Sequence, residues 1–135
     1  TTLFNALTGL RAKTANFPGT TVEHQVGRAR AGAREVELID LPGVYDLAGS
    51  GLEEQVTRAA LLGGDPSRPR ADLAVVVLDA TNLPRTLCLA SEVLELGLPT
   101  LVALNRMDRA QRAGIAIDLE ALRAELGVPV VPISA

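Results

Sequence analysis

The sequence predicts an α/β fold in which a mostly parallel sheet, with one antiparallel edge strand, carries helices on both faces. From residue 73 onward, apolar runs alternate as strand, helix, strand, helix and strand. That order is typical of parallel strands joined by right-handed crossovers. The composition agrees, because 47% of the 135 residues are hydrophobic but only 2% are aromatic. Such an aliphatic core is common where helices cover both faces of a parallel sheet.

The N-terminal half is predicted to contain two helices and a β-hairpin. Apolar residues at a spacing of three and four predict the first helix, and Gly9 ends it. A run with Pro18 and Gly19 predicts a loop, and looser alternation predicts the hairpin. The elements are expected at residues 2–8 (helix), 10–21 (loop), 22–29 (edge strand), 35–41 (strand) and 52–62 (helix).

The C-terminal half supplies the parallel strands. A polar connector rich in Pro and Gly is expected at 63–70. Asp118 is the expected N-cap of the last helix, which ends at Gly127. The remaining elements are expected at residues 73–78 (strand), 83–96 (helix), 100–104 (strand), 118–126 (helix) and 130–133 (strand).

Charge and rare residues exclude several functions. The net charge of −3 argues against a nucleic-acid-binding protein, which would carry a basic surface. Cys88 is the only cysteine and is predicted to be a small buried core residue in a reducing, cytosolic setting. His24, the only histidine, is predicted to be exposed on the edge strand. No apolar run reaches the roughly 18 residues that a membrane span requires.

A carboxylate and a glycine follow the second hairpin strand, in the run Asp40-Leu41-Pro42-Gly43. A carboxylate at a strand end can hold Mg²⁺, often through water. The backbone N–H of Gly43 can approach a terminal phosphate closely, because no side chain intervenes. Pro-Gly is also ordinary turn chemistry, so this run alone does not decide between the two.

A second polar run, Asn105-Arg106-Met107-Asp108, directly follows the strand at 100–104. Guanine presents two donors on one edge, and a single carboxylate can accept both in a charge-assisted pair. Adenine lacks this pair of donors, so such a site rejects the wrong base. An asparagine amide can bind the base and also link neighbouring loops. A polar loop without a ligand is the alternative.

Two further loops could complete a nucleotide site. Ser134 and Ala135, after the last strand, could place backbone groups near the guanine O6. The loop at 16–23 carries threonines, and a loop threonine can offer its hydroxyl to Mg²⁺ and its N–H to a terminal phosphate. Both contacts exist only while that phosphate is bound, so such a loop acts as a switch. The alternative is a surface loop before a hairpin.

The chain begins with two threonines at the start of a helix. N–H groups at a helix N-terminus face phosphate, and in G-x-x-x-x-G-K-[ST] the hydroxyl residue ligates Mg²⁺. Thr1 fits that last position if Gly-Lys precedes it, whereas an ordinary N-cap is the alternative. Because no Met precedes Thr1 and Ala135 ends the chain abruptly, we expect both ends to be cuts. The phosphate-binding lysine and the first central strand are then missing.

In this order the motifs resemble the G domain of the bacterial ferrous iron transport protein B family, which has the P-loop GTPase fold. The resemblance covers nearly the whole chain and indicates one partial G domain over residues 1–135. The stretch from 78 to 105 is more specific than the short motifs. The resembling stretches are TTLFNALTG, NFPGTTVEHQVG, DLPGVYDL, LDATNLPRTLCLASEVLELGLPTLVALN and LRAELGVPVVPIS.

The resemblance implies a GTP-binding and GTP-hydrolysing domain that regulates ferrous iron uptake. It implies GTP or GDP as ligand and Mg²⁺ held by Thr1, Thr21 and Asp40, and K⁺ is a further candidate ion. The domain would lie on the cytoplasmic side of the inner membrane, attached to the membrane-embedded part of the same full-length chain. A homo-oligomer is a further possibility that the sequence leaves open. The implied nucleotide-binding residues are Thr1, Thr2, Gly19, Thr20, Thr21, Val22, Glu23, Asp40, Leu41, Pro42, Gly43, Asn105, Arg106, Met107, Asp108, Ile133, Ser134 and Ala135.

The catalytic group is not identified by the sequence. No Gln follows Gly43 to orient water, since Val44 and Tyr45 come next, so slow intrinsic hydrolysis is predicted. The 135 residues alone are predicted to be inactive, because the phosphate-binding loop is absent. Arg106 stands where most GTPases have lysine. Two alternatives stay open: a ribosome-assembly or translation-type GTPase, and a guanine-nucleotide sensor that does not hydrolyse.

Overall fold

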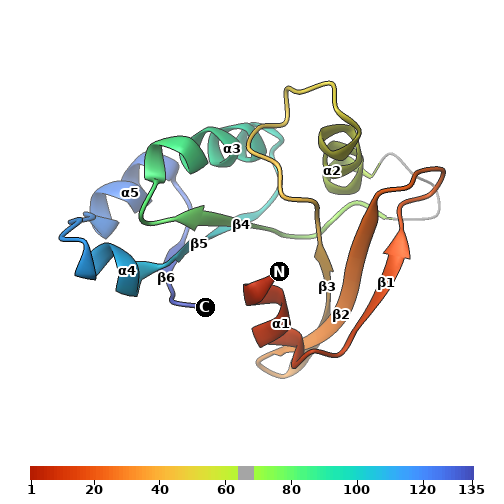
Figure 1. Ribbon diagram of the computed structural model, residues 1–135, viewed down its shortest axis with the longest axis horizontal. Helices are drawn as coiled ribbons and strands as arrows, with labels where there is room; N and C mark the ends of the chain where they lie inside the picture. Colours follow the sequence, from red (N-terminus) through yellow and green to blue (C-terminus); the bar gives the residue numbers. More distant parts are fainter. Residues whose placement is uncertain (64–68) are drawn as a thin grey trace.

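The computed structural model describes residues 1–63 and 69–135 and contains two three-stranded sheets (Figure 1). One sheet is antiparallel, in the order β1-β2-β3, and the other is parallel, in the order β4-β5-β6. The strands are β1 (Ala12–Asn16), β2 (Glu23–Ala31), β3 (Arg34–Asp40), β4 (Ala74–Asp79), β5 (Thr100–Asn105) and β6 (Val130–Pro132). The helices are α1 (Thr2–Thr8), α2 (Leu52–Leu62), α3 (Leu83–Glu95), α4 (Met107–Arg112) and α5 (Leu119–Leu126).

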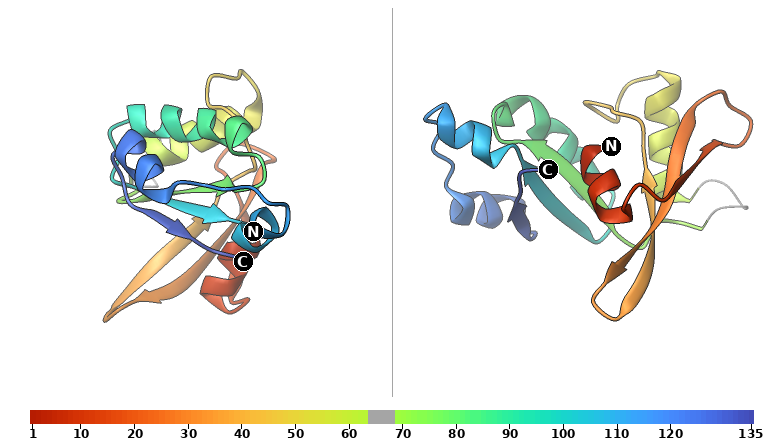
Figure 2. Two further views of the ribbon diagram at one scale, coloured as in Figure 1. Left: turned by 90° about the vertical axis from the view of Figure 1, so that its left-hand side faces the viewer. Right: turned by 60° about the horizontal axis from the view of Figure 1, so that its bottom comes forward.

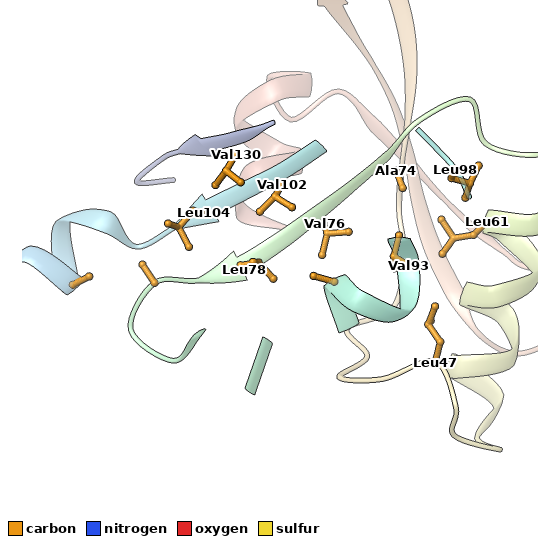
Figure 3. Close-up of a cluster of buried hydrophobic side chains, with 13 residues drawn as sticks. Leu47, Leu61, Ala74, Val76, Leu78, Val93, Leu98, Val102, Leu104 and Val130 are labelled. Carbon is orange, nitrogen blue, oxygen red and sulfur yellow. The ribbon is translucent and has the colours of Figure 1, made fainter. Parts of the chain in front are cut away.

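The main core lies between the parallel sheet and its helices. Alternate residues of β4 point to one face, so Val76 and Leu78 are buried. They meet Val102 and Leu104 of β5, which are fully buried, and Val93 of α3. Figure 3 shows these side chains together with those that α2 and the loop before it contribute. The expected aliphatic core is confirmed.

Helix α1 packs closely on the antiparallel sheet. Gly27 of β2 lies directly under it, and a Cβ at that position would be 2.6 Å from Thr8 Cγ2 and 3.1 Å from Phe4 Cζ. Phe4 and Thr8 are both buried, and the Thr8 hydroxyl donates to the Phe4 carbonyl at 2.9 Å. This packing against β2 positions the start of α1, where Thr1 lies.

Two elements were not expected. β1 lies inside the predicted loop at 10–21. It was not predicted, because all five of its residues are exposed and show no apolar pattern. β2 is consequently the middle strand of its sheet rather than an edge strand, and the antiparallel part is larger than one strand. Helix α4 begins directly after Arg106, where a loop was expected, and has only six residues. Of the predicted connector at 63–70, residues 64–68 lie outside the described residues.

Two single residues also differ from expectation. His24 is only 3% exposed, because its ring stacks on Phe17 with centroids 4.1 Å apart. Cys88 is exposed. Ala90 and Val93 are the buried residues of α3, and Cys88, two positions before Ala90, lies on a different face of the helix. Within residues 1–63 and 69–135, no helix has the length and apolar character needed to cross a bilayer.

Candidate functional site

The start of α1 meets the end of β3. The Thr1 hydroxyl donates to Asp40 Oδ2 at 2.8 Å, although the two residues are 39 positions apart. Asp40 is the last residue of β3 and Thr1 is the N-cap of α1. The structure therefore brings together a hydroxyl oxygen and a carboxylate oxygen, the hard ligands that Mg²⁺ prefers.

The two candidate threonines in the loop between β1 and β2 have different contacts. The Thr20 hydroxyl donates to the Phe17 carbonyl at 3.0 Å and accepts from the Val22 N–H at 3.2 Å, so it closes a local turn. Thr21 is exposed and lines an open cleft together with Gly43. The structure thus places Thr21 with the glycine of the Asp40 run, and gives Thr20 a role within its own loop.

The remaining predicted residues of this region lie nearby. Val22, Glu23 and Pro42 line the same cleft. Gly19 sits at the tip of the loop in a left-handed conformation with φ of 72°, which favours glycine. Thr2 lies exposed in the first turn of α1.

At the other end of the site, β5 carries the second polar run. Asn105 Oδ1 accepts from the Arg106 N–H at 2.8 Å and from the Ala135 N–H at 2.9 Å. The Met107 N–H donates to the Ile133 carbonyl at 3.2 Å. Asn105 thus links the loop after β5 to the chain after β6, as its amide was expected to do.

Asp108 lies in the first turn of α4 and is tied to the same neighbour. Its backbone N–H donates to Ser134 Oγ at 3.1 Å, and its carboxylate lies 3.6 Å from Arg112 Nη2. Desolvation raises the pKa of Asp108, but hydrogen bonds from Arg109 N–H and Ser134, together with the Arg112 charge, outweigh it. The pKa is lowered overall, so Asp108 is ionised at neutral pH and can accept two hydrogen bonds.

Asp79 is a site residue that the motifs did not reveal. It ends β4 and is the register partner of Asn105 on β5. Its Oδ1 accepts from the Thr81 N–H at 2.9 Å and from the Thr81 hydroxyl at 2.6 Å, and its Oδ2 lies 2.9 Å from Arg106 Nη1. A carboxylate at the end of a buried strand, beside another polar strand end, is the signal that could have identified it.

The two ends of the site lie on one side of the molecule. Figure 1 and both views of Figure 2 place the N-terminus and the C-terminus in the same region of the molecule. The polar residues at 79, 105 and 108 belong to the carboxyl ends of the parallel strands or the turn that follows, where α/β folds bind ligands. Parallel strands that alternate with helices and carry polar loops at their carboxyl ends are the arrangement of the P-loop GTPase fold.

Comparisons with known proteins identify the family. The family model described as ferrous iron transport protein B matches residues 1–135. The Fe(2+) transporter FeoB of Escherichia coli (strain K12) is 44% identical over 98% of this chain. The cytosolic domain of the T. maritima FeoB iron transporter, solved in a GDP form and a GMPPNP form, superposes with a TM-score of 0.89 at 41% identity, covering 98% of this chain and 50% of that one. The chain belongs to the ferrous iron transport protein B family, and the expected family and fold are confirmed.

The match is to one part of the curated relatives. This chain covers 17% of the length of the E. coli transporter. What the complete transporter does is therefore a property of a much longer protein.

Proposed function

We propose that this chain binds guanine nucleotide and hydrolyses GTP slowly as the G domain of a ferrous iron transporter. The observation that carries the proposal is the junction at Asn105, whose Oδ1 joins the loop after β5 to the chain after β6. That junction sets Asp108 beside Ser134, where one ionised carboxylate is available to a base.

Asp108 supplies the selectivity for guanine. Its carboxylate accepts from N1–H and from the 2-amino group of the base, and adenine offers no such pair. Asn105 and the backbone of Ser134 and Ala135 hold the base from the other side. Since the contacting groups are already tied to one another, little further ordering is needed when the base enters.

Thr1, Thr21 and Asp40 are the proposed Mg²⁺ ligands. The donor set fits the ion, because Thr1 and Asp40 bring two oxygens within 2.8 Å of each other and no soft ligand is involved. When bound, Mg²⁺ neutralises charge on the phosphates during hydrolysis. Gly43 donates its N–H to the terminal phosphate, and Thr21 closes over it from the facing side of the cleft.

Hydrolysis is slow in this proposal because Val44 follows Gly43 and offers no polar group to water. A backbone group of the loop at 16–23, with K⁺ as a candidate aid, orients the attacking water. Family membership favours control of iron(II) uptake over ribosome assembly, and the E. coli relative carries the name Fe(2+) transporter. In that setting the domain works on the cytoplasmic side of the inner membrane, beside the membrane-embedded part of the transporter.

The test is a change of base preference. The 135 residues contain no G-x-x-x-x-G-K sequence, so the assay uses a chain extended before Thr1 by the strand and phosphate-binding loop of a relative. The extended chain should bind GDP and not ADP, whereas the chain without the extension should bind GDP weakly. Asp108→Asn should shift preference from GDP to xanthosine diphosphate, because an amide donor then faces the 2-oxo group of xanthine.

A matched substitution controls for loss of a carboxylate. Asp118 caps α5 by accepting from the Ala121 N–H at 3.0 Å and is not one of the proposed base-binding residues. Asp118→Asn keeps a good N-cap and should leave the preference for GDP intact. If Asp108→Asn retains the GDP preference, or if the extended wild type binds ADP as well as GDP, the proposal is wrong.

A further inference from the structure

The ends of β4 and β5 are joined by a charged pair between Asp79 and Arg106. Asp79 and Asn105 are register partners, and the Ala80 N–H donates to the Asn105 carbonyl at 2.9 Å. Arg106, the next residue, reaches back so that its Nη1 lies 2.9 Å from Asp79 Oδ2. The pair therefore spans from the end of one strand to the loop after its neighbour.

Arg106 has an uncommon backbone conformation for a residue with a side chain. Its φ is 63°, in the left-handed region that glycine favours. This turn separates Asn105 from the first turn of α4, where Asp108 lies. The relative direction of these two base-binding side chains thus depends on how Arg106 is held.

Asp79 is itself held in place. Its Oδ1 accepts both the N–H and the hydroxyl of Thr81, so the carboxylate has little rotational freedom. The side chain of Asp79 is 25% exposed and that of Arg106 is 50% exposed. A partly shielded pair with one fixed partner can hold a strained turn, whereas a freely solvated pair contributes little.

We propose that Asp79 is a positioning residue for guanine recognition, which acts by holding Arg106 and so sets the direction of Asp108 relative to Asn105. The inference rests on the proposed function. Asp79 makes no contact with the base in this scheme and acts only through Arg106. Its removal should therefore weaken contacts that need accurate direction more than it weakens binding as a whole.

The experiment compares GDP with inosine diphosphate in the extended chain described above. Inosine lacks the 2-amino group and keeps N1–H, so it makes only one of the two bonds to Asp108. Asp79→Asn should reduce GDP affinity about twofold to fivefold and inosine diphosphate affinity less, so the ratio of the two falls. A variant that only destabilises the fold would lower both affinities alike and leave the ratio unchanged.

A double-mutant cycle tests the route through Arg106. Arg106→Gln should lower the same ratio, and adding Asp79→Asn to it should lower the ratio little further, because the pair is already broken. Glu120→Gln, which removes an exposed ion pair with Arg123 on α5, is the control and should leave the ratio at the wild-type value.

The outcomes separate this inference from the function beneath it. If the wild type does not prefer GDP over ADP, the proposed function fails. If the wild type prefers GDP but Asp79→Asn leaves the GDP-to-inosine-diphosphate ratio unchanged, only the positioning role is wrong. Additive effects of the two substitutions would likewise overturn it.

Discussion

The contact between α1 and Gly27 gives the sharpest prediction, because it links packing to the proposed metal site. In Gly27→Ala the new Cβ would lie 2.6 Å from Thr8 Cγ2 and 3.0 Å from the Arg11 carbonyl oxygen. Carbon atoms pack best at about 3.5–4.0 Å, so α1 must move by about 1 Å. Such overpacking typically costs about 1–3 kcal/mol.

The same shift should affect function. The Thr1 hydroxyl lies 2.8 Å from Asp40 Oδ2, and a displacement of about 1 Å would bring it beyond hydrogen-bonding distance. Gly27→Ala should therefore lower the urea midpoint, followed by circular dichroism, and also weaken Mg²⁺-dependent binding of GDP by the extended chain.

A second substitution shows whether the clash is the cause. Thr8→Ser removes the methyl group nearest to the new Cβ and keeps the hydroxyl that donates to the Phe4 carbonyl. The cost of Gly27→Ala should shrink in the Thr8→Ser background, although the Arg11 carbonyl still limits the relief. An unchanged urea midpoint in Gly27→Ala, or an equal cost in both backgrounds, would refute the seating of α1 on β2.

Two further predictions concern the parallel sheet. Leu78 is fully buried beneath α3, so Leu78→Ala should lower the free energy of unfolding by about 2–5 kcal/mol, measured by urea titration; a loss within about 0.5 kcal/mol would show that the site is not packed as described. For Asp79, desolvation raises the pKa, but hydrogen bonds from Thr81 and the Arg106 charge outweigh it, and the pKa is lowered. The ionised form therefore stabilises the fold above about pH 4, and this contribution is lost as the pH falls through the lower folded-state pKa. The difference in unfolding free energy between wild type and Asp79→Asn should accordingly shrink below about pH 4, and a difference independent of pH would contradict this reasoning.

The elements that the sequence predicted best are those with a repeating apolar pattern and a clear end. Helix α2 spans residues 52–62 as expected, since Gly51 precedes it and Gly63 ends it in a left-handed conformation. β4 and β5 were expected from continuous apolar runs, and each begins or ends within one residue of the prediction. In these cases the local signal and the tertiary packing agree.

The missed elements lack such a signal. β1 has only exposed residues and becomes a strand because its backbone pairs with β2. Helix α4 is too short for a periodic pattern, and only Ala110 of its residues is buried. His24 was predicted to be a surface residue because the sequence does not show that Phe17, in the loop after β1, packs against the His24 ring. Each of these features depends on a contact between distant or irregular segments.

The candidate site divides in the same way. Motif spacing predicted Asp40, Asn105 and Asp108 at or just after strand ends, and the structure has them there; their role in binding stays a prediction. Spacing alone did not distinguish Thr20 from Thr21, whereas the family resemblance indicated Thr21; in the structure it is the Thr20 hydroxyl that closes the local turn. It also passed over Asp79, whose role becomes visible only when the register of β4 and β5 sets it opposite Asn105.

The two ends of the proposed site differ in the contacts that the described residues make. At the base end, hydrogen bonds join the strand ends: Asn105 accepts from Arg106 and Ala135, Arg106 donates to Asp79, and Asp108 donates to Ser134. At the phosphate end, the Thr1 hydroxyl donates to Asp40, while Thr21 is exposed at the cleft. In a GTPase the base stays the same through the cycle and the terminal phosphate is gained and lost. Under the proposed function, the loop that carries the exposed Thr21 is suited to report that change, because its ordering can depend on the phosphate.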